Sequence, residues 1–318
     1  MPQIHRAIVF LLAVSAGYAD VTLRYKAEIK PNPGLPAQMV EAMGKGVSAS
    51  MPPEGVLQIK GDKGFSSMGP IRSIVDMKGK QITVLDPEKQ QYGTTDMEHF
   101  AEEARKVFSD MPPEARAAMG TMKISSDSRM TGRTTTIQGI EAEEREATMS
   151  IEGPAVPNMP PGPMITMTMQ FWTAKAGQEE RSPALKELLQ RRLWDYETMS
   201  PAAMMQAMFR DMPGMGEGMV KFIEDMRSAN RVVLRTNASM RMPGVMAMMK
   251  QMPADKNPFG EKFDADAPLF EIRNEVVEIS TAAIPDSVFE IPAGYKAVPL
   301  AEIVKGIMDR AKAATQGK

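Results

Sequence analysis

Few side chains in this sequence can carry out chemistry. Cysteine is absent, and the only histidines are His5 and His99. The lack of cysteine excludes disulfides, thiolate metal sites and cysteine nucleophiles. Any nucleophile–histidine pair would need His99 as its base, but this residue lies at the start of an expected helix at about 97–109, which favours a solvent-facing side chain. The sequence contains no Gly-x-Ser-x-Gly elbow, HExxH segment or EF-hand spacing. We therefore expect a protein that is not an enzyme and has no cofactor.

Carboxylates are densest in the segment Glu141-Ala142-Glu143-Glu144-Arg145-Glu146. Such a cluster can indicate a calcium site or acid–base catalysis. Here Arg145 lies among the acids and the segment has the polarity of a strand or turn, so a solvated face is the favoured interpretation.

Methionine is the residue in excess, with 31 among 318 residues. Fourteen methionines lie between Met199 and Met252, many at i, i+4 or i, i+7 spacing, which places them on one face of a helix. Three interpretations remain open. In the first the methionines fill a core as adaptable spacers, and in the second they line a deformable apolar cavity. Alternatively, clustered thioethers bind the soft ion Cu(I), and the candidate ligands are Met240, Met242, Met246 and Met248.

Charge and hydropathy exclude other classes of protein. The chain has 38 basic and 40 acidic residues, a formal net charge of −2 and a pI of about 5.9. Nothing in this balance favours nucleic acid as a partner. After residue 19 no segment is apolar for 18 residues, and a membrane-spanning helix needs about 20. We therefore expect no transmembrane segment in the mature chain.

The first nineteen residues have the pattern of an export signal. Arg6 provides a positive start, residues 7–16 are apolar, and Gly17 and Ala19 are small residues at the −3 and −1 positions of a cleavage site. We expect residues 1–19 to be a signal peptide cleaved after Ala19. The predicted location is the periplasm, with secretion as the second choice.

Alternating polarity predicts strands in both halves of the chain. Residues 21–29 alternate, and so do 164–172, where Ile165, Met167, Met169 and Phe171 share one face. Between them, turn residues separate a meander of short strands, expected at 55–60, 63–68, 70–77, 80–85 and 90–94.

The remaining elements are expected in separate blocks. Residues 182–228 are predicted to be helical in pieces, starting at Ser182-Pro183. Strands are expected at 231–242, 269–281 and 287–291, and a helix at 299–314. Strands and helices that are segregated in this way indicate an α+β fold with an antiparallel sheet. We expect one domain at 20–298 with a Met-rich helical insertion at about 182–268, followed by a C-terminal helical region at 299–318.

Four phrases in this order carry a family resemblance: Lys60–Gly69, Ile82–Pro87 followed by Gln91-Tyr92, Phe171–Ala174 and Ile284–Lys296. Together they resemble an exported bacterial family of unassigned function that is related to the LolA/LolB-like lipoprotein-carrier superfamily. The resemblance covers about 20–175 and 268–298. It implies an open antiparallel β half-barrel with helices packed on its concave face, and an apolar interior that holds acyl chains.

We therefore expect a periplasmic protein that binds a hydrophobic ligand, such as a lipid, an acyl chain or a lipoprotein. The side chains expected toward the ligand are Ile59, Phe65, Val75, Val84, Met167, Met169, Phe171 and Phe270 from strands, and Met204, Met208, Met219 and Met226 from helices. Two alternatives stay open: a periplasmic Cu(I)-binding protein, and a structural or interaction protein of the cell envelope that has no ligand.

Overall fold

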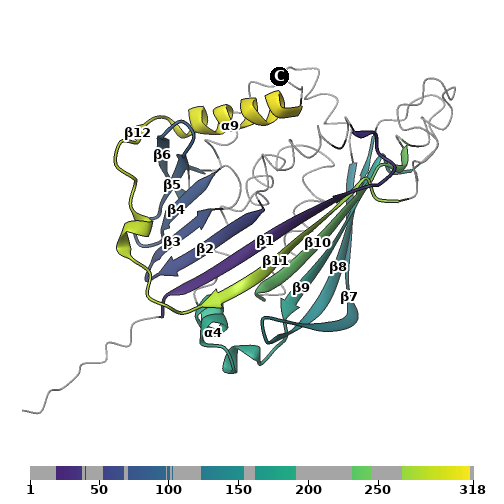
Figure 1. The fold of residues 1–318 in the computed structure, drawn as a ribbon, viewed down its shortest axis with the longest axis horizontal. Helices are drawn as coiled ribbons and strands as arrows, with labels where there is room; N and C mark the ends of the chain where they lie inside the picture. Colours follow the sequence, from purple (N-terminus) through teal and green to yellow (C-terminus); the bar gives the residue numbers. More distant parts are fainter. Residues whose placement is uncertain are drawn as a thin grey trace, which may run out of the picture.

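Twelve strands form one open sheet in the computed structural model (Figure 1). The structure describes residues 19–37, 40, 53–67, 71–97, 99, 100, 102, 123–153, 162–190, 231–244, 246 and 267–315. Within these residues the strands are β1 (Val21–Pro31), β2 (Glu54–Lys60), β3 (Lys63–Ser67), β4 (Arg72–Asp76), β5 (Gln81–Asp86), β6 (Gln91–Asp96), β7 (Lys123–Ile137), β8 (Ile140–Glu152), β9 (Ile165–Ala174), β10 (Val233–Arg241), β11 (Phe270–Ser280) and β12 (Lys296–Ala297).

The strand order is β12-β6-β5-β4-β3-β2-β1-β11-β10-β9-β8-β7. Two meanders therefore lie side by side, and the N-terminal strand β1 joins them by pairing with β2 on one side and β11 on the other. Every described pair is antiparallel except the short β12, which runs parallel to β6. The expected open antiparallel sheet is confirmed. The described residues contain two α-helices, α4 (Pro183–Gln190) and α9 (Leu300–Thr315), and the 3₁₀ turns η1 (Gln178–Glu180) and η4 (Asp286–Phe289), so the described fold is mostly β.

Both faces of the β3–β6 meander are covered. Ile82 and Val84 of β5 pack against Leu300 and Ile303 of α9. On the opposite face, a separate cluster joins Ile74 and Leu85 to the segment that follows β11, with Ile284 and Phe289 buried in it. The strand expected at 287–291 is wrong, because η4 occupies 286–289 and its apolar side chains pack onto the sheet face instead of pairing at an edge.

Helix α9 lies close to the sheet because β6 contains a glycine at the contact point. Gly93 is the register partner of Val84, and a Cβ atom on Gly93 would lie 2.9 Å from the Cα atom of Leu300. Any other residue there would push the start of α9 away from β6. The observed helix at 300–315 confirms the C-terminal helix that the sequence predicts.

Helix α4 begins as the sequence predicts. Pro183 is its first residue, and the Ser182 Oγ accepts a hydrogen bond of 3.4 Å from the Leu185 N–H, which satisfies a free donor of the first turn. Leu185 and Leu188 are fully buried in one core with residues from β1, β2 and β11 and from β7 to β10. β11 pairs with β10 only as far as Glu275 and continues beside β1 to Ser280. Helix α4 lies near this end of β11 (Figure 1).

Candidate functional site

Strands β8 to β11 carry a row of thioethers on one face. The register aligns Met149 with Met167, Met167 with Met240, and Met240 with Phe270. Residues directly opposite one another in a sheet point to the same face, with Cβ atoms about 5 Å apart. Three methionines and a phenylalanine from four strands therefore form one continuous apolar row.

The next row on this face has a different composition. Met169 lies between Ala147 of β8 and Ala238 of β10, and Ala238 is aligned with Ile272 of β11. Ile165, Met167, Met169 and Phe171 alternate along β9, so they share the face, as the sequence predicts. We call these residues of β8–β11, which are Met149, Ala147, Met167, Met169, Phe171, Ala238, Met240, Phe270 and Ile272, the apolar face.

The register shows on which side of the sheet the other strand residues predicted to face the ligand lie. Ile59, Val75 and Val84 lie on the same side of the sheet, but Ile59 packs in the core around α4 and Val84 packs against α9. Phe65 lies on the opposite side, where it packs with Ile74 and Leu85. The structure therefore brings Met167, Met169, Phe171 and Phe270 together and leaves the other four elsewhere. Met204, Met208, Met219 and Met226 lie outside the described residues.

The proposed copper ligands fall partly on the apolar face. Met240 and Met242 pack in one cluster with Met246, Leu35 and Leu269. Met246 is only 6% exposed. Met248 lies outside the described residues. Three of the four sulfur side chains thus belong to one apolar cluster at the end of β10.

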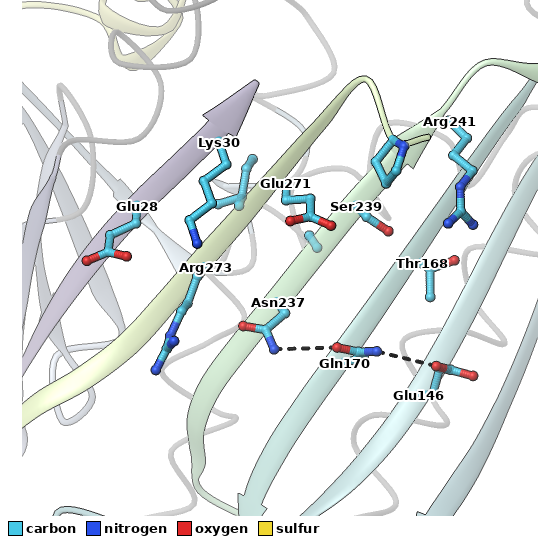
Figure 2. Close-up of a pocket in the computed structure, with 13 residues that line it drawn as sticks. Glu28, Lys30, Glu146, Thr168, Gln170, Asn237, Ser239, Arg241, Glu271 and Arg273 are labelled. Carbon is cyan, nitrogen blue, oxygen red and sulfur yellow. Dashed lines mark hydrogen bonds between the residues drawn. The ribbon is translucent and has the colours of Figure 1, made fainter. Parts of the chain in front are cut away.

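The opposite face of the same strands is polar and hollowed. A groove of about 460 Å³ crosses β1 and β8–β11 (Figure 2). Its lining side chains come from alternate positions on each strand: Glu28 and Lys30 of β1, Glu146 of β8, Thr168 and Gln170 of β9, Asn237, Ser239 and Arg241 of β10, and Glu271 and Arg273 of β11. We call this surface the polar groove.

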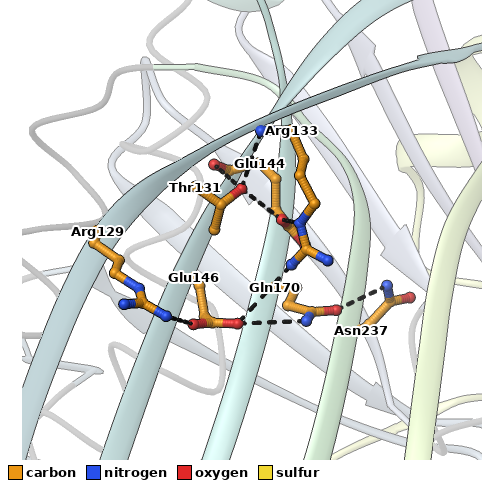
Figure 3. Close-up of polar contacts among 7 residues, drawn as sticks. All are labelled: Arg129, Thr131, Arg133, Glu144, Glu146, Gln170 and Asn237. Carbon is orange, nitrogen blue, oxygen red and sulfur yellow. Dashed lines mark hydrogen bonds and ion pairs between the residues drawn. The ribbon is translucent and has the colours of Figure 1, made fainter.

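One side of the polar groove contains a chain of hydrogen bonds (Figure 3). The Asn237 amide donates to the Gln170 carbonyl oxygen at 3.4 Å, and the Gln170 amide donates to a Glu146 oxygen at 3.5 Å. Arg129 of β7 donates to the other Glu146 oxygen at 2.8 Å. The hydrogen bond from Arg129 is the main reason that the pKa of Glu146 lies below its usual value.

A second carboxylate is held next to the groove. Both Arg235 and Arg273 donate to the same oxygen of Glu275, Arg235 through Nε at 2.5 Å and Arg273 through Nε at 2.9 Å. Burial alone would raise the pKa of Glu275, but the two guanidinium groups outweigh it, and the pKa is lowered. Arg235 also lies over the ring of Trp172, 5.8 Å from its centroid.

Glu144 corrects the interpretation of the glutamate cluster as a solvated face. Its side chain is 0% exposed. Thr131 donates to its Oε2 atom at 2.6 Å, and Arg133 forms an ion pair with the same oxygen (Figure 3). Its Oε1 atom is buried and has no hydrogen-bond partner within the described residues. The same is true of the Nε1 atom of Trp172, which is aligned with Glu144 on the neighbouring strand β9. Glu141 remains exposed as expected.

The remaining histidine and many possible metal ligands lie in the described residues. His99 is 62% exposed in its side chain, as expected, and forms a 3.6 Å ion pair with Asp96. No group of three or more His, Cys, Asp or Glu side chains gathers around a possible metal position in the described part of the chain. None of the helices described here has the length and apolar character needed to cross a membrane.

Comparison with known proteins does not assign a family. No family model and no curated protein matches the chain. Among solved structures, PNGF-II matches with a TM-score of 0.33 and 8% identity over 92% of this chain, which spans 33% of the PNGF-II chain. The Mycobacterium tuberculosis lipoprotein LppX matches with a TM-score of 0.25 and 8% identity, over 81% of this chain and 85% of LppX. The strand order and register define the class of this protein: a large, open, mostly antiparallel sheet.

Proposed function

We propose that this protein is a non-enzymatic exported protein that binds a hydrophobic ligand against the apolar face of β8–β11. The ligand class is a lipid, an acyl chain or the acylated end of a lipoprotein, and the compartment is the periplasm. The proposed architecture is a half-barrel of the lipoprotein-carrier kind with helices on its concave side. The observation that supports it best is the aligned row of Met149, Met167, Met240 and Phe270.

The chemistry of this row suits an apolar ligand of variable shape. Methionine is unbranched and polarizable, so neighbouring thioethers adapt to chains of different length. Ala147 and Ala238 flank Met169 in the adjacent row, so a small side chain lies on each side of its longer one. Affinity would come from apolar burial at about 25 cal/mol per Å² removed from water, less the cost of ordering the ligand.

Native mass spectrometry of the gently purified full chain, followed by titration with a fluorescent acyl probe, tests this proposal. We expect copurified lipid and saturable probe uptake. In Met169→Gln an amide replaces a thioether of similar size, and burial of that amide costs about 1–3 kcal/mol, so probe affinity should fall about tenfold. Thr168→Gln, on the opposite face of β9, is the matched control and should leave probe affinity unchanged. A folded protein without lipid and without probe uptake would overturn the proposal.

A second candidate function is binding of Cu(I). It is favoured by one observation: Met149, Met167 and Met240 are direct neighbours across three strands, and Met240 packs with Met242 and Met246. Thioethers are soft ligands that select Cu(I). Under this hypothesis the ligands include Met149 and Met167 as well as the thioethers near the end of β10.

Uptake of Ag(I), a soft monovalent substitute for Cu(I), distinguishes the two functions. Stoichiometric uptake measured by mass should disappear in the double variant Met167→Leu/Met240→Leu and persist in Met169→Leu, whose aligned neighbours are alanines. Leucine preserves the apolar surface, so the double variant should still take up the acyl probe if a lipid is the ligand. Absence of uptake at micromolar ion removes the copper function and leaves the hydrophobic one unaffected.

A further inference from the structure

We propose that the polar groove is a second binding site, which takes a neutral polyhydroxylated ligand of the saccharide class. The site lies on the opposite face of the strands that carry the apolar face, so it is independent of the proposed function. Its volume of about 460 Å³ falls within the range of about 300–1,000 Å³ that small-molecule sites occupy.

The charges that line the groove cancel. Three acidic side chains, Glu28, Glu146 and Glu271, face three basic ones, Lys30, Arg241 and Arg273. A lining with no net formal charge exerts little net attraction on either an anion or a cation. The balance therefore favours a ligand that has no net charge but contains many hydrogen-bonding groups.

One side of the groove carries charged side chains that, among the described residues, are not paired with one another. Lys30 of β1 is aligned with Glu271 of β11, and yet no ion pair joins them in the part of the chain that the structure describes. Arg241 lies nearby on β10, and Figure 2 shows Glu271 between Lys30 and Arg241. The hydroxyls of Ser239 and Thr168 complete this side. A sugar hydroxyl both donates and accepts, so it can use cationic donors and a carboxylate acceptor at the same site, through hydrogen bonds stronger than those between neutral groups.

The other side of the groove holds planar amides in place. Gln170 and Asn237 make hydrogen bonds of 3.4 and 3.5 Å, which is beyond the usual 2.7–3.2 Å range. These bonds are weak, so a ligand can replace them at small cost. Glu146, which orients Gln170, is itself held by the 2.8 Å bond from Arg129. The amides therefore project from regular strands into the groove, and only Glu146 at the end of the chain of hydrogen bonds is held by a short contact.

The test uses the fluorescently labelled full chain on an array of defined neutral and acidic oligosaccharides, with calorimetric titration of the best neutral one. We expect saturable binding with an affinity that changes less than twofold between 50 and 300 mM NaCl, because screening affects charged ligands. Gln170→Ala and Arg241→Ala should each weaken binding about tenfold or more. Arg24→Ala is the matched control. Arg24 lies on β1 outside the groove lining, exposed and paired with Glu278, and its replacement should leave the affinity unchanged.

Three results would overturn the inference. One is a folded chain that binds no saccharide on the array. Another is binding of acidic ligands alone with steep salt dependence, since that would show an anion site. The third is neutral-ligand binding that Gln170→Ala and Arg241→Ala leave unchanged. Met169→Gln, which disturbs only the apolar face, should retain saccharide binding, so failure of the hydrophobic function and failure of this inference are separable.

Discussion

The Arg310 guanidinium of α9 donates a hydrogen bond of 2.8 Å to Oδ2 of Asp86, a residue that is fully buried at the end of β5. The other oxygen of the same carboxylate accepts the backbone N–H groups of Glu88 and Lys89 at 3.2 and 3.3 Å. One buried carboxylate therefore orders the β5–β6 turn and fastens the C-terminal helix to it.

Replacing Arg310 should destabilise the protein strongly. Arg310→Met leaves the Asp86 carboxylate buried without its cation, and loss of one partner of a buried pair costs about 3–5 kcal/mol, less here because Arg310 is partly exposed. We expect a loss of about 2–3 kcal/mol in urea unfolding. Arg24→Met, which removes a pair with 55% and 52% exposed side chains, should cost less than about 1 kcal/mol. Equal losses in the two variants would contradict the anchoring role.

The pair formed by Glu144 and Arg133 should show strong coupling. Arg133→Met alone removes the cation from a carboxylate that is 0% exposed, but Arg133 itself is 58% exposed, so we expect a cost of about 1–3 kcal/mol. Glu144→Gln removes the charge and should make Arg133→Met nearly neutral. A double-mutant cycle in urea should therefore give an interaction energy above about 1 kcal/mol. Additive effects would mean that Arg133 does not compensate the buried charge.

Stability should fall in acid partly through Glu146 and Glu275. The pKa of each carboxyl is lowered in the folded protein by arginine hydrogen bonds, which outweigh burial at Glu275. A lowered folded-state pKa stabilises the protein above the unfolded glutamate value of about 4.3, and this contribution disappears as the pH falls through the folded-state value. The variant Glu146→Gln/Glu275→Gln should therefore lose less unfolding free energy than the parent between about pH 5 and pH 3. Parallel pH curves for the two proteins would be inconsistent with this assignment.

The N-terminal segment should be removed on export. When residues 1–318 are expressed in a Gram-negative host, the intact mass of the chain recovered from the periplasm should correspond to one that begins at Asp20. Ala19→Arg places a large residue at the −1 position and should block cleavage, whereas Tyr18→Phe, at the less restricted −2 position, should not. An uncleaved chain that stays in the cytosol would contradict the export prediction.

Local pattern was sufficient where apolar and polar residues alternate strictly along a strand or where a helix start carries its own signal. Along β9 the alternation of apolar and polar residues predicts that Met167, Met169 and Phe171 share a face, and the register agrees. The Ser182-Pro183 signal likewise predicts the start of α4. In both places the necessary information lies within a few neighbouring residues.

Pattern was insufficient where both faces are covered. On β4 and β5 adjacent residues such as Ile74 and Val75, or Val84 and Leu85, are all buried, because α9 covers one face and residues 284–295 cover the other. On such strands an apolar residue can face either side of the sheet, so apolar character alone does not show on which side a residue lies. Phe65 accordingly packs in the same cluster as Phe289 and Tyr295, on the side of the sheet opposite to Met167.

By itself the sequence determined the strand-rich antiparallel character of the chain, the start of α4, the C-terminal helix and the abundance of thioethers. Only the tertiary structure decided which of these residues meet. Met149, Met167 and Met240 become neighbours, and Lys30 comes to face Glu271, because β1 pairs with β11 and the register joins segments far apart in the chain. Register is set by the pairing of whole strands, and a shift of one residue would exchange the polar and apolar faces. The alternation within each strand opposes such a shift, but it does not specify which distant strands pair, and both candidate sites depend on that pairing.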